Sequence, residues 1–234
     1  MLCQFSVKNY KSIREEMTFD MQATAIMEHR DRIIKTEDGE SFLPVSVIYG
    51  PNGGGKSNVL EVLHTLDAKV LRPLCATCDK TECEYKARKI PVEPFAFSEE
   101  IRKEPTEFEV FFRTDIAEYR YILHVKQDIV AYESLDRIRL DTGRRSALFV
   151  RNGNEVELKG VFGKIKISEE ISEGLPLLSY LGITYKKNEV ISDVIEWFEE
   201  SIDFLNYGSP RQELRTAIAK TDEVKKLVLD MIRE

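Results

Sequence analysis

The chain has 234 residues, 42% of them hydrophobic and 32% charged, so it can bury a core in one large domain or two small lobes. It contains no run of about 18 apolar residues, and its start has no basic region followed by an apolar one. We therefore expect neither a membrane span nor a signal peptide, and a cytoplasmic location. The formal net charge of -7 argues against electrostatic wrapping of nucleic acid over the whole surface, although not against a local basic patch.

The first part of the chain and its middle are expected to be rich in strands. Alternating apolar and polar residues between Leu2 and Met21 predict two strands around a polar turn, and a polar loop follows over 28–40. Further strand-like runs, separated by turn residues, predict an antiparallel meander that comprises residues 92–98, 107–113, 118–125, 129–140 and 146–151.

A strand, a glycine-rich loop and a helix are predicted between these two regions. The β-branched run from Val45 to Tyr49 is typical of a short buried strand. After the loop, apolar residues recur at helical spacing, which predicts an amphipathic helix from Lys56 to about Arg72 that Pro73 stops.

The period becomes helical from Ser168 onward, with apolar faces over 191–205 and 224–231. We therefore expect a mixed α/β fold. Residues 1–167 would form one lobe, with a Cys-bearing connector at 73–90, and residues 168–234 would form a helical segment.

The glycine-rich loop matches the pattern G-x-x-x-x-G-K-[ST] at every fixed position from Gly50 to Ser57. A triphosphate is enclosed only where successive backbone N–H groups point inward, which requires φ values that glycine reaches at low cost. The start of the next helix adds its partial positive charge. Lys56 is expected to act as a catalytic cation at the β and γ phosphates, and Ser57 to offer a hydroxyl ligand to Mg²⁺. ATP and Mg²⁺ are thus the predicted ligands, with contacts from Gly50, Asn52, Gly53, Gly54, Gly55, Lys56, Ser57 and Asn58.

Hydrolysis needs more than this loop, because a carboxylate must hold the magnesium and another residue must orient the attacking water. Asp230 follows the apolar run Leu227 to Leu229, but its neighbours have helical periodicity, so it is interpreted as an exposed helical residue. We expect this chain alone to bind ATP far better than it hydrolyses it.

The sequence resembles the ABC-like, SMC-related P-loop ATPases of bacterial anti-phage and abortive-infection systems, including the OLD-type and Septu-type ATPases of the AAA group. The resemblance is carried by the opening run Phe5 to Ile13 and by the loop with its flanks. It is also carried by residues of the middle region, namely Pro94-Phe95, Pro105 to Glu109 and Tyr119-Arg120-Tyr121.

The resemblance implies the N-terminal lobe of an ABC/SMC-type ATPase head. Two such heads would sandwich two ATP molecules, as a homodimer or higher oligomer, and control an effector such as a nuclease. The segment 168–234 would lead to a second lobe that carries the signature motif and the magnesium carboxylate. The resemblance also implies that Lys11 and Ser12 lie near the nucleotide, the alternative being a turn that only ties strands together. Gln127 is the nearest candidate for a magnesium-sensing glutamine, and its setting favours a hairpin turn.

Two further features leave alternatives open. Cys75, Cys78 and Cys83 have the spacing C-x₂-C-x₄-C, which is typical of a zinc site only if a fourth ligand such as His64 is available. A redox or disulfide role and reduced thiols are the alternatives. A local basic surplus surrounds the predicted turn 141–143, formed by Arg137, Arg139, Arg144 and Arg145 among others. A solvated hairpin and a nucleic-acid contact both fit it. A nucleotide-gated DNA- or protein-binding module without turnover, similar to a RecF or SMC head of DNA repair, is therefore the second hypothesis.

Overall fold

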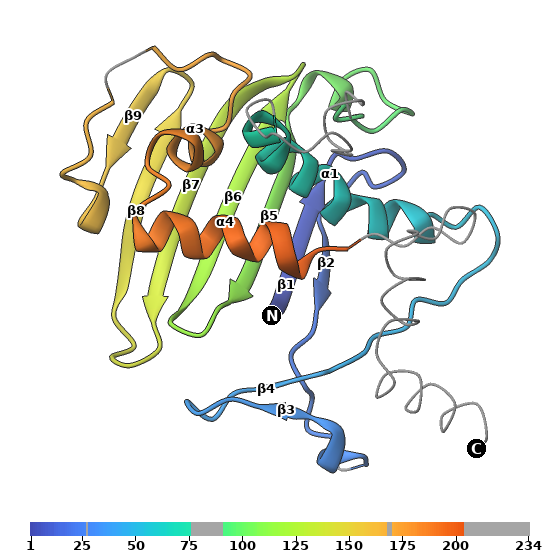
Figure 1. Cartoon of the computed structure of the whole chain (residues 1–234). Helices are drawn as coiled ribbons and strands as arrows, with labels where there is room; N and C mark the ends of the chain where they lie inside the picture. Colours follow the sequence, from blue (N-terminus) through green and yellow to red (C-terminus); the bar gives the residue numbers. More distant parts are fainter. Residues whose placement is uncertain (27, 76–90, 168–169, 204–234) are drawn as a thin grey trace, which may run out of the picture. The chain divides into compact units, whose positions relative to one another are not determined.

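A seven-stranded antiparallel sheet, in the order β2-β1-β5-β6-β7-β8-β9, is the scaffold of the computed structural model, which describes residues 1–26, 28–75, 91–167 and 170–203 (Figure 1). Its strands are β1 (Leu2–Lys8), β2 (Met17–Asp20), β5 (Thr106–Arg113), β6 (Ala117–Lys126), β7 (Ile129–Arg139), β8 (Arg145–Asn152) and β9 (Glu155–Leu158). A separate hairpin is formed by β3 (Ile34–Lys35) and β4 (Ser41–Phe42). Residues Met1–Ile202 make up one compact unit.

The meander forms because its strands alternate between apolar and polar residues. In β5, Thr106, Phe108, Val110 and Phe112 are buried, and the residues between them are mostly half-buried. Tyr119, Tyr121 and Leu123 continue the buried face on β6. The predicted meander is thus confirmed over four of its runs, and β9 extends it by a strand that the sequence reading missed.

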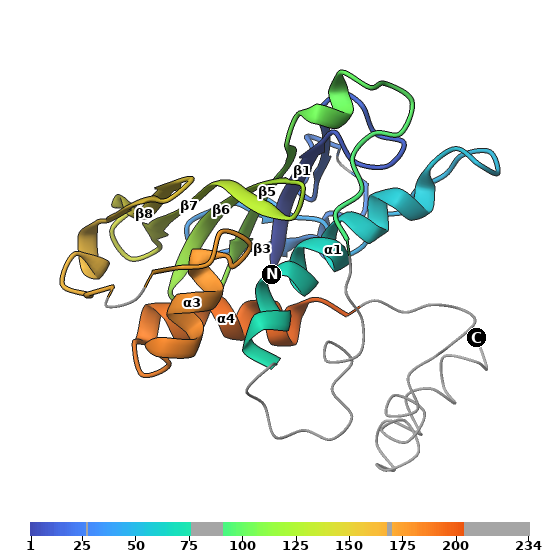
Figure 2. The same cartoon turned by 90° about the horizontal axis from the view of Figure 1, so that it is seen from above.

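The helices cover one face of this sheet (Figure 2). They are α1 (Lys56–Cys75), α3 (Leu177–Thr184) and α4 (Glu189–Ser201), with short 3₁₀ turns at Arg30–Arg32, Ile101–Lys103 and Gly160–Phe162. The ring of Trp197 on α4 stacks on Phe112 with centroids 4.0 Å apart, and Ser179 on α3 donates to the carbonyl of Val70 on α1. Among the described residues, no helix combines the length and the apolarity that crossing a membrane requires.

A buried glutamate joins the helical layer to the sheet. Glu133 on β7 is fully buried and accepts hydrogen bonds from the amides of Leu177 and Leu178, at 2.5 and 2.9 Å, and from the hydroxyl of Tyr121 at 2.9 Å. Burial raises the pKa of this carboxyl, while the three donors oppose the rise. Glu133 therefore serves as the acceptor for the first turn of α3.

Three local predictions were wrong. Residues 45–49 form no strand and are mostly exposed, and no strand among the described residues pairs with them. Residues 92–98 form irregular chain rather than a strand. Helix α1 does not stop before Pro73 but includes this proline in its last turn. A proline at this position removes a single backbone hydrogen bond close to the C-terminal end, where the last carbonyl groups of any helix lack partners within the helix. The predicted helix over 224–231 lies outside the described residues.

Candidate nucleotide-binding site

The loop from Gly50 to Ser57 is a tight turn that contains two glycines with positive φ. Gly53 and Gly55 have φ of 77° and 85°, in the left-handed region that glycine reaches without strain. The amide of Gly54 donates to the carbonyl of Pro51 at 3.1 Å, which closes the turn. Helix α1 begins at Lys56, so its first amides face the loop without partners inside the helix. These features fit an anionic ligand with several oxygens.

The side chain of Lys56 folds back over the same loop. Its Nζ lies 2.8 Å from the carbonyl oxygen of Gly50 and 2.7 Å from that of Pro51. An ammonium group has three donors, so one remains for a phosphate oxygen while the loop carbonyls hold the charge in position. Ser57 is exposed on the first turn of α1, where its hydroxyl is accessible to a metal ion. The residues therefore fit ATP with Mg²⁺.

The turn after β1 contacts α1 along three successive turns of the helix. Tyr10 shares a hydrogen bond of 2.7 Å with the hydroxyl of Thr65, and Lys11 forms an ion pair with Glu61. Ser12 accepts a hydrogen bond of 2.7 Å from the Nδ2 of Asn58. Since residues 58, 61 and 65 lie on one helical face, this turn fixes the position of the helix that begins at the phosphate loop.

Ser12 also touches the loop itself. A Cβ built on Gly55 would lie 2.9 Å from the Oγ of Ser12, closer than real Cβ contacts allow. The positive φ favours glycine at this position, and a larger residue would in addition displace the hydroxyl of Ser12. The predicted proximity of Ser12 to the loop is consistent with this geometry, whereas the charge of Lys11 is engaged by Glu61.

Asn9 is a residue of this turn whose role the sequence reading missed. It is fully buried with φ of 56°, and its side-chain amide donates to the carbonyls of Ile101, Glu104 and Pro105 while its Oδ1 accepts from the amide of Phe95. Asn9 therefore fixes the chain between residues 95 and 105 against the turn. No local periodicity could have indicated these contacts, because they join residues about ninety positions apart.

The remaining predicted candidates are Asn52 in the loop, Gln127 in a hairpin turn, and the cysteines. Asn52 is exposed in the loop, and Gln127 occupies the β6–β7 turn with φ of 51°, as its hairpin setting predicted. Cys75 ends α1, and Cys78 and Cys83 lie outside the described residues, so the zinc hypothesis is not tested. Among the described residues, no group of three or more His, Cys, Asp or Glu side chains could hold a metal ion. Burial raises the pKa of the Cys3 thiol to about 12.

The basic hairpin between β7 and β8 exists as predicted. Arg139, Arg144 and Arg145 are exposed around the turn, and Arg139 pairs with Asp141, which reduces the free positive charge. Arg137 lies two residues before Arg139 on β7, farther from the turn, and is half-buried.

Comparison with known protein families assigns the region around the loop to a family. The model of the family described as "AAA domain, putative AbiEii toxin, Type IV TA system" matches residues 45–205, which is most of the chain. The chain belongs to this family. It is a mixed α/β P-loop ATPase domain of the AAA type, to which nucleotide binding is intrinsic. Comparison with curated proteins finds no match. The matched range begins at Val45, so the turn 9–12 lies outside it although its side chains hold α1.

Proposed function

We propose that the chain binds ATP with Mg²⁺ at Gly50–Ser57, with Lys56 holding the β and γ phosphates and Ser57 contributing a ligand to the metal. Bound Mg²⁺ would neutralise phosphate charge, and the amides at the start of α1 would bind phosphate oxygens. Gly50, Asn52, Asn58 and Ser12 would complete the cradle. Lys11 would act mainly by positioning α1, because Glu61 already pairs with it.

We further propose that hydrolysis requires a second lobe that supplies the magnesium carboxylate. The observation that carries this proposal is the exposure of an apolar segment directly before the loop. Val45, Val47 and Tyr49 are 70%, 61% and 87% exposed, although their β-branched and aromatic side chains suit a strand buried in a sheet. Strands of a second lobe that paired with residues 45–49 would cover these side chains and bring a carboxylate to the loop.

In this proposal the completed head pairs with a second head across two ATP molecules and so controls an effector, such as a nuclease, in antiviral defence. Within the described part of α1, Glu61 is a carboxylate near the loop, but it forms an ion pair with Lys11. It is therefore not a free ligand for magnesium. The chain alone is therefore expected to remain a nucleotide binder with weak turnover.

Binding of a fluorescent ATP analogue, with Mg²⁺ and with EDTA, tests the loop. Lys56→Ala should weaken binding at least about tenfold, the value of one charge-assisted hydrogen bond. Lys103→Ala, which removes an exposed lysine from the 3₁₀ turn Ile101–Lys103, is the matched control and should bind like the wild type. Ser57→Ala should reduce the difference between Mg²⁺ and EDTA. Equal binding by wild type and Lys56→Ala would contradict the proposed site.

ATPase assays test the composite site. The chain alone should hydrolyse ATP slowly, and addition of a separately expressed second lobe, whose apolar strand ends in Asp-Glu, should produce activity that Lys56→Ala abolishes. Efficient hydrolysis by the chain alone would rule out the need for a second lobe.

A second candidate function is a nucleotide-gated DNA- or protein-binding module without turnover. The observation that favours it is the exposed pair Arg144 and Arg145 at the tip of the β7–β8 hairpin. Salt-sensitive DNA binding that Arg144→Ala and Arg145→Ala weaken together would support it, and a mixture of lobes that binds ATP tightly without hydrolysis would favour it over the ATPase.

A further inference from the structure

The segment 91–98 presents an exposed phenyl ring beside the turn 9–12. Phe97 is 82% exposed, whereas Phe95, whose ring lies edge-on to that of Phe97 with centroids 5.5 Å apart, is half-buried. A single exposed apolar side chain is common at protein surfaces and by itself indicates little. The importance of Phe97 depends on how its backbone is held and on what lies near it.

Arg102 fixes the backbone on both sides of Phe97. The guanidinium of Arg102 donates a hydrogen bond to the carbonyl of Ala96 at 2.6 Å, and its main-chain amide donates to the carbonyl of Ser98 at 3.0 Å. The ring therefore projects from a backbone that is already held in place. A flat ligand that binds to such a ring needs to order few further groups, which reduces the entropic cost of binding.

The same segment is hydrogen-bonded to the turn that touches the phosphate loop. The amide of Lys11 donates to the carbonyl of Glu93 at 2.9 Å, and the carbonyl of Lys11 accepts from the amide of Ala96 at 3.3 Å. Ser12, the next residue of the turn, has its Oγ 2.9 Å from the Cβ position of Gly55. Two consecutive residues of the turn thus connect this segment to the phosphate loop.

The separation between Phe97 and the loop suits a nucleotide. The path from Gly55 to Phe97 crosses the contacts of Ser12 and Lys11 and two steps between neighbouring Cα atoms, each about 3.8 Å long. Both views of the molecule show the segment, drawn in green, beside this turn (Figures 1 and 2). A triphosphate held at the loop would extend its sugar and base over a distance of this order.

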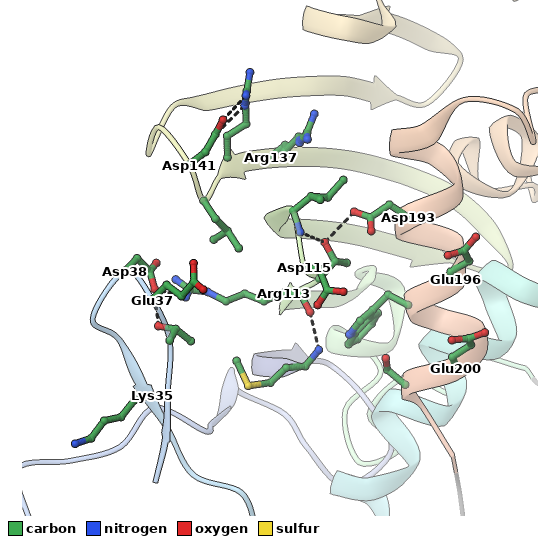
Figure 3. Close-up of a pocket in the computed structure, with 18 residues that line it drawn as sticks. Lys35, Glu37, Asp38, Arg113, Asp115, Arg137, Asp141, Asp193, Glu196 and Glu200 are labelled. Carbon is green, nitrogen blue, oxygen red and sulfur yellow. Dashed lines mark hydrogen bonds and ion pairs between the residues drawn. The ribbon is translucent and has the colours of Figure 1, made fainter.

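The cavity shown in Figure 3 is not an alternative place for the base. Its volume is about 1090 Å³, and Met1 lines it, so it lies at the start of β1, whereas the turn 9–12 follows this strand. Seven residues of extended chain, at about 3.3 Å each, separate the two ends of β1. A nucleotide whose phosphates bind at Gly50–Ser57 would have to cross this length of the sheet.

We propose that Phe97 stacks on the base of the bound nucleotide and makes the site prefer a nucleoside triphosphate to a bare triphosphate. The inference rests on the proposed function, because the loop must first hold the phosphates. An aromatic ring offers its face to any base, so the preference among bases is modest and favours purines, which have the larger ring area. Phe97 is thus a specificity-determining residue, and it makes no contact with the reacting phosphates.

Calorimetric titration of the full chain with ATP, CTP and inorganic tripolyphosphate, each with Mg²⁺, tests the base contact. The wild type should bind ATP at least about fivefold more tightly than tripolyphosphate, which is the lower value for stacking of a base on an aromatic side chain. Phe97→Leu should weaken ATP binding by that factor and leave tripolyphosphate binding unchanged. Tyr49→Leu, which removes another exposed ring close to the loop, is the matched control and should keep the preference for ATP.

Phe97→Trp reports the contact directly. This variant should keep the preference for ATP, and its emission should be quenched by ATP but not by tripolyphosphate, because only the former has a base that can stack on the indole. The wild type gives the baseline, since its single tryptophan, Trp197, is 4% exposed. Urea denaturation verifies that each variant folds.

The outcomes separate this inference from the proposed nucleotide site. Equal ATP affinity of wild type and Phe97→Leu, or an equal loss of affinity for ATP and tripolyphosphate, would overturn the base contact alone, provided that Lys56→Ala still weakens the binding of both ligands. Absence of binding, or binding that does not depend on Lys56, would overturn the proposed site and the base contact with it.

Discussion

The sheet core and the segment before the phosphate loop differ in how far their side chains are buried and paired. In the core even a charged group is fully paired, since Glu133 is 0% exposed and accepts three hydrogen bonds. In the segment 44–50 apolar side chains face solvent, with Val47 61% and Tyr49 87% exposed. The two regions join at α1, which packs into the core at its far end and carries the loop at its start.

This difference is what the proposed second lobe would require, namely a core that is complete by itself and a nucleotide site that depends on additional contacts. A substitution in the core should therefore change stability with little effect on the site. A substitution in the loop should change nucleotide affinity with a smaller effect on stability, and one in the exposed segment should change neither until a partner lobe is present. Each prediction below tests one part of this comparison.

The largest effect is expected from Glu133→Ala. The amides of Leu177 and Leu178 and the hydroxyl of Tyr121 would lose their acceptor in a buried setting, which should lower the free energy of unfolding by about 3 kcal/mol or more. Urea denaturation measures the change. Glu155→Ala, at an exposed position of β9, should change it by less than about 0.5 kcal/mol. The folded fraction of the Glu133 variant should still bind ATP with normal affinity. A loss of affinity would show that the core and the nucleotide site are energetically coupled, contrary to the comparison.

A smaller effect on stability, with a direct effect on the site, is expected from Gly55→Ala. The new Cβ would combine a φ of 85° with a collision against the Ser12 hydroxyl, so the loop or this hydroxyl must shift, and nucleotide affinity should fall about tenfold or more. Gly39→Ala is the control for backbone strain, because Gly39 has φ of 89° and no atom near its Cβ position. Both variants should lose about 1–3 kcal/mol of stability, but only the first should lose affinity.

The contact between Ser12 and Gly55 can be separated from backbone strain by a double mutant. Ser12→Gly removes the Oγ that the new Cβ would meet, so it should restore part of the affinity that Gly55→Ala loses. Equal losses in the single and the double mutant would indicate that φ alone decides the requirement for glycine.

A modest effect is expected from Lys11→Met, which distinguishes a positioning role from phosphate contact. The pair with Glu61 is partly exposed, so its loss should cost less than about 1 kcal/mol of stability and reduce ATP affinity by about twofold. Lys8→Met, which breaks the pair with Glu107 on β5, is the matched control and should leave affinity unchanged. A loss of affinity above about tenfold for Lys11→Met would show that this lysine contacts phosphate.

The phosphate loop and the meander were predictable because their signals are local. The loop pattern needs only eight consecutive residues, and strands such as β5 carry their burial in simple alternation. The turn 9–12 was predicted from the alternation around it, but its proximity to the loop was indicated only by family resemblance, because the contacts of Tyr10 and Lys11 with α1 join residues about fifty positions apart.

The failures also have physical causes. Residues 45–49 have the composition of a buried strand, but composition cannot provide the neighbouring strands that burial requires. Helix α3 lies within the segment predicted to be helical, but its bounds were not predicted, because most of its eight residues are buried and no amphipathic period marks them. Glu133 reads as a polar position in an alternating strand, and its burial depends on α3, which comes more than forty residues later.

The smallest effect on the isolated chain is expected from Val47→Ser. Val47 is 61% exposed and belongs to no strand, so the free energy of unfolding should change by less than about 0.5 kcal/mol and ATP affinity should be unchanged. In the presence of a second lobe the same substitution should weaken lobe association, because a serine gains less than a valine from burial between strands. Val161→Ser, at another exposed valine, is the control. Association that is equally strong for both variants would mean that residues 45–49 do not form the surface on which the second lobe pairs.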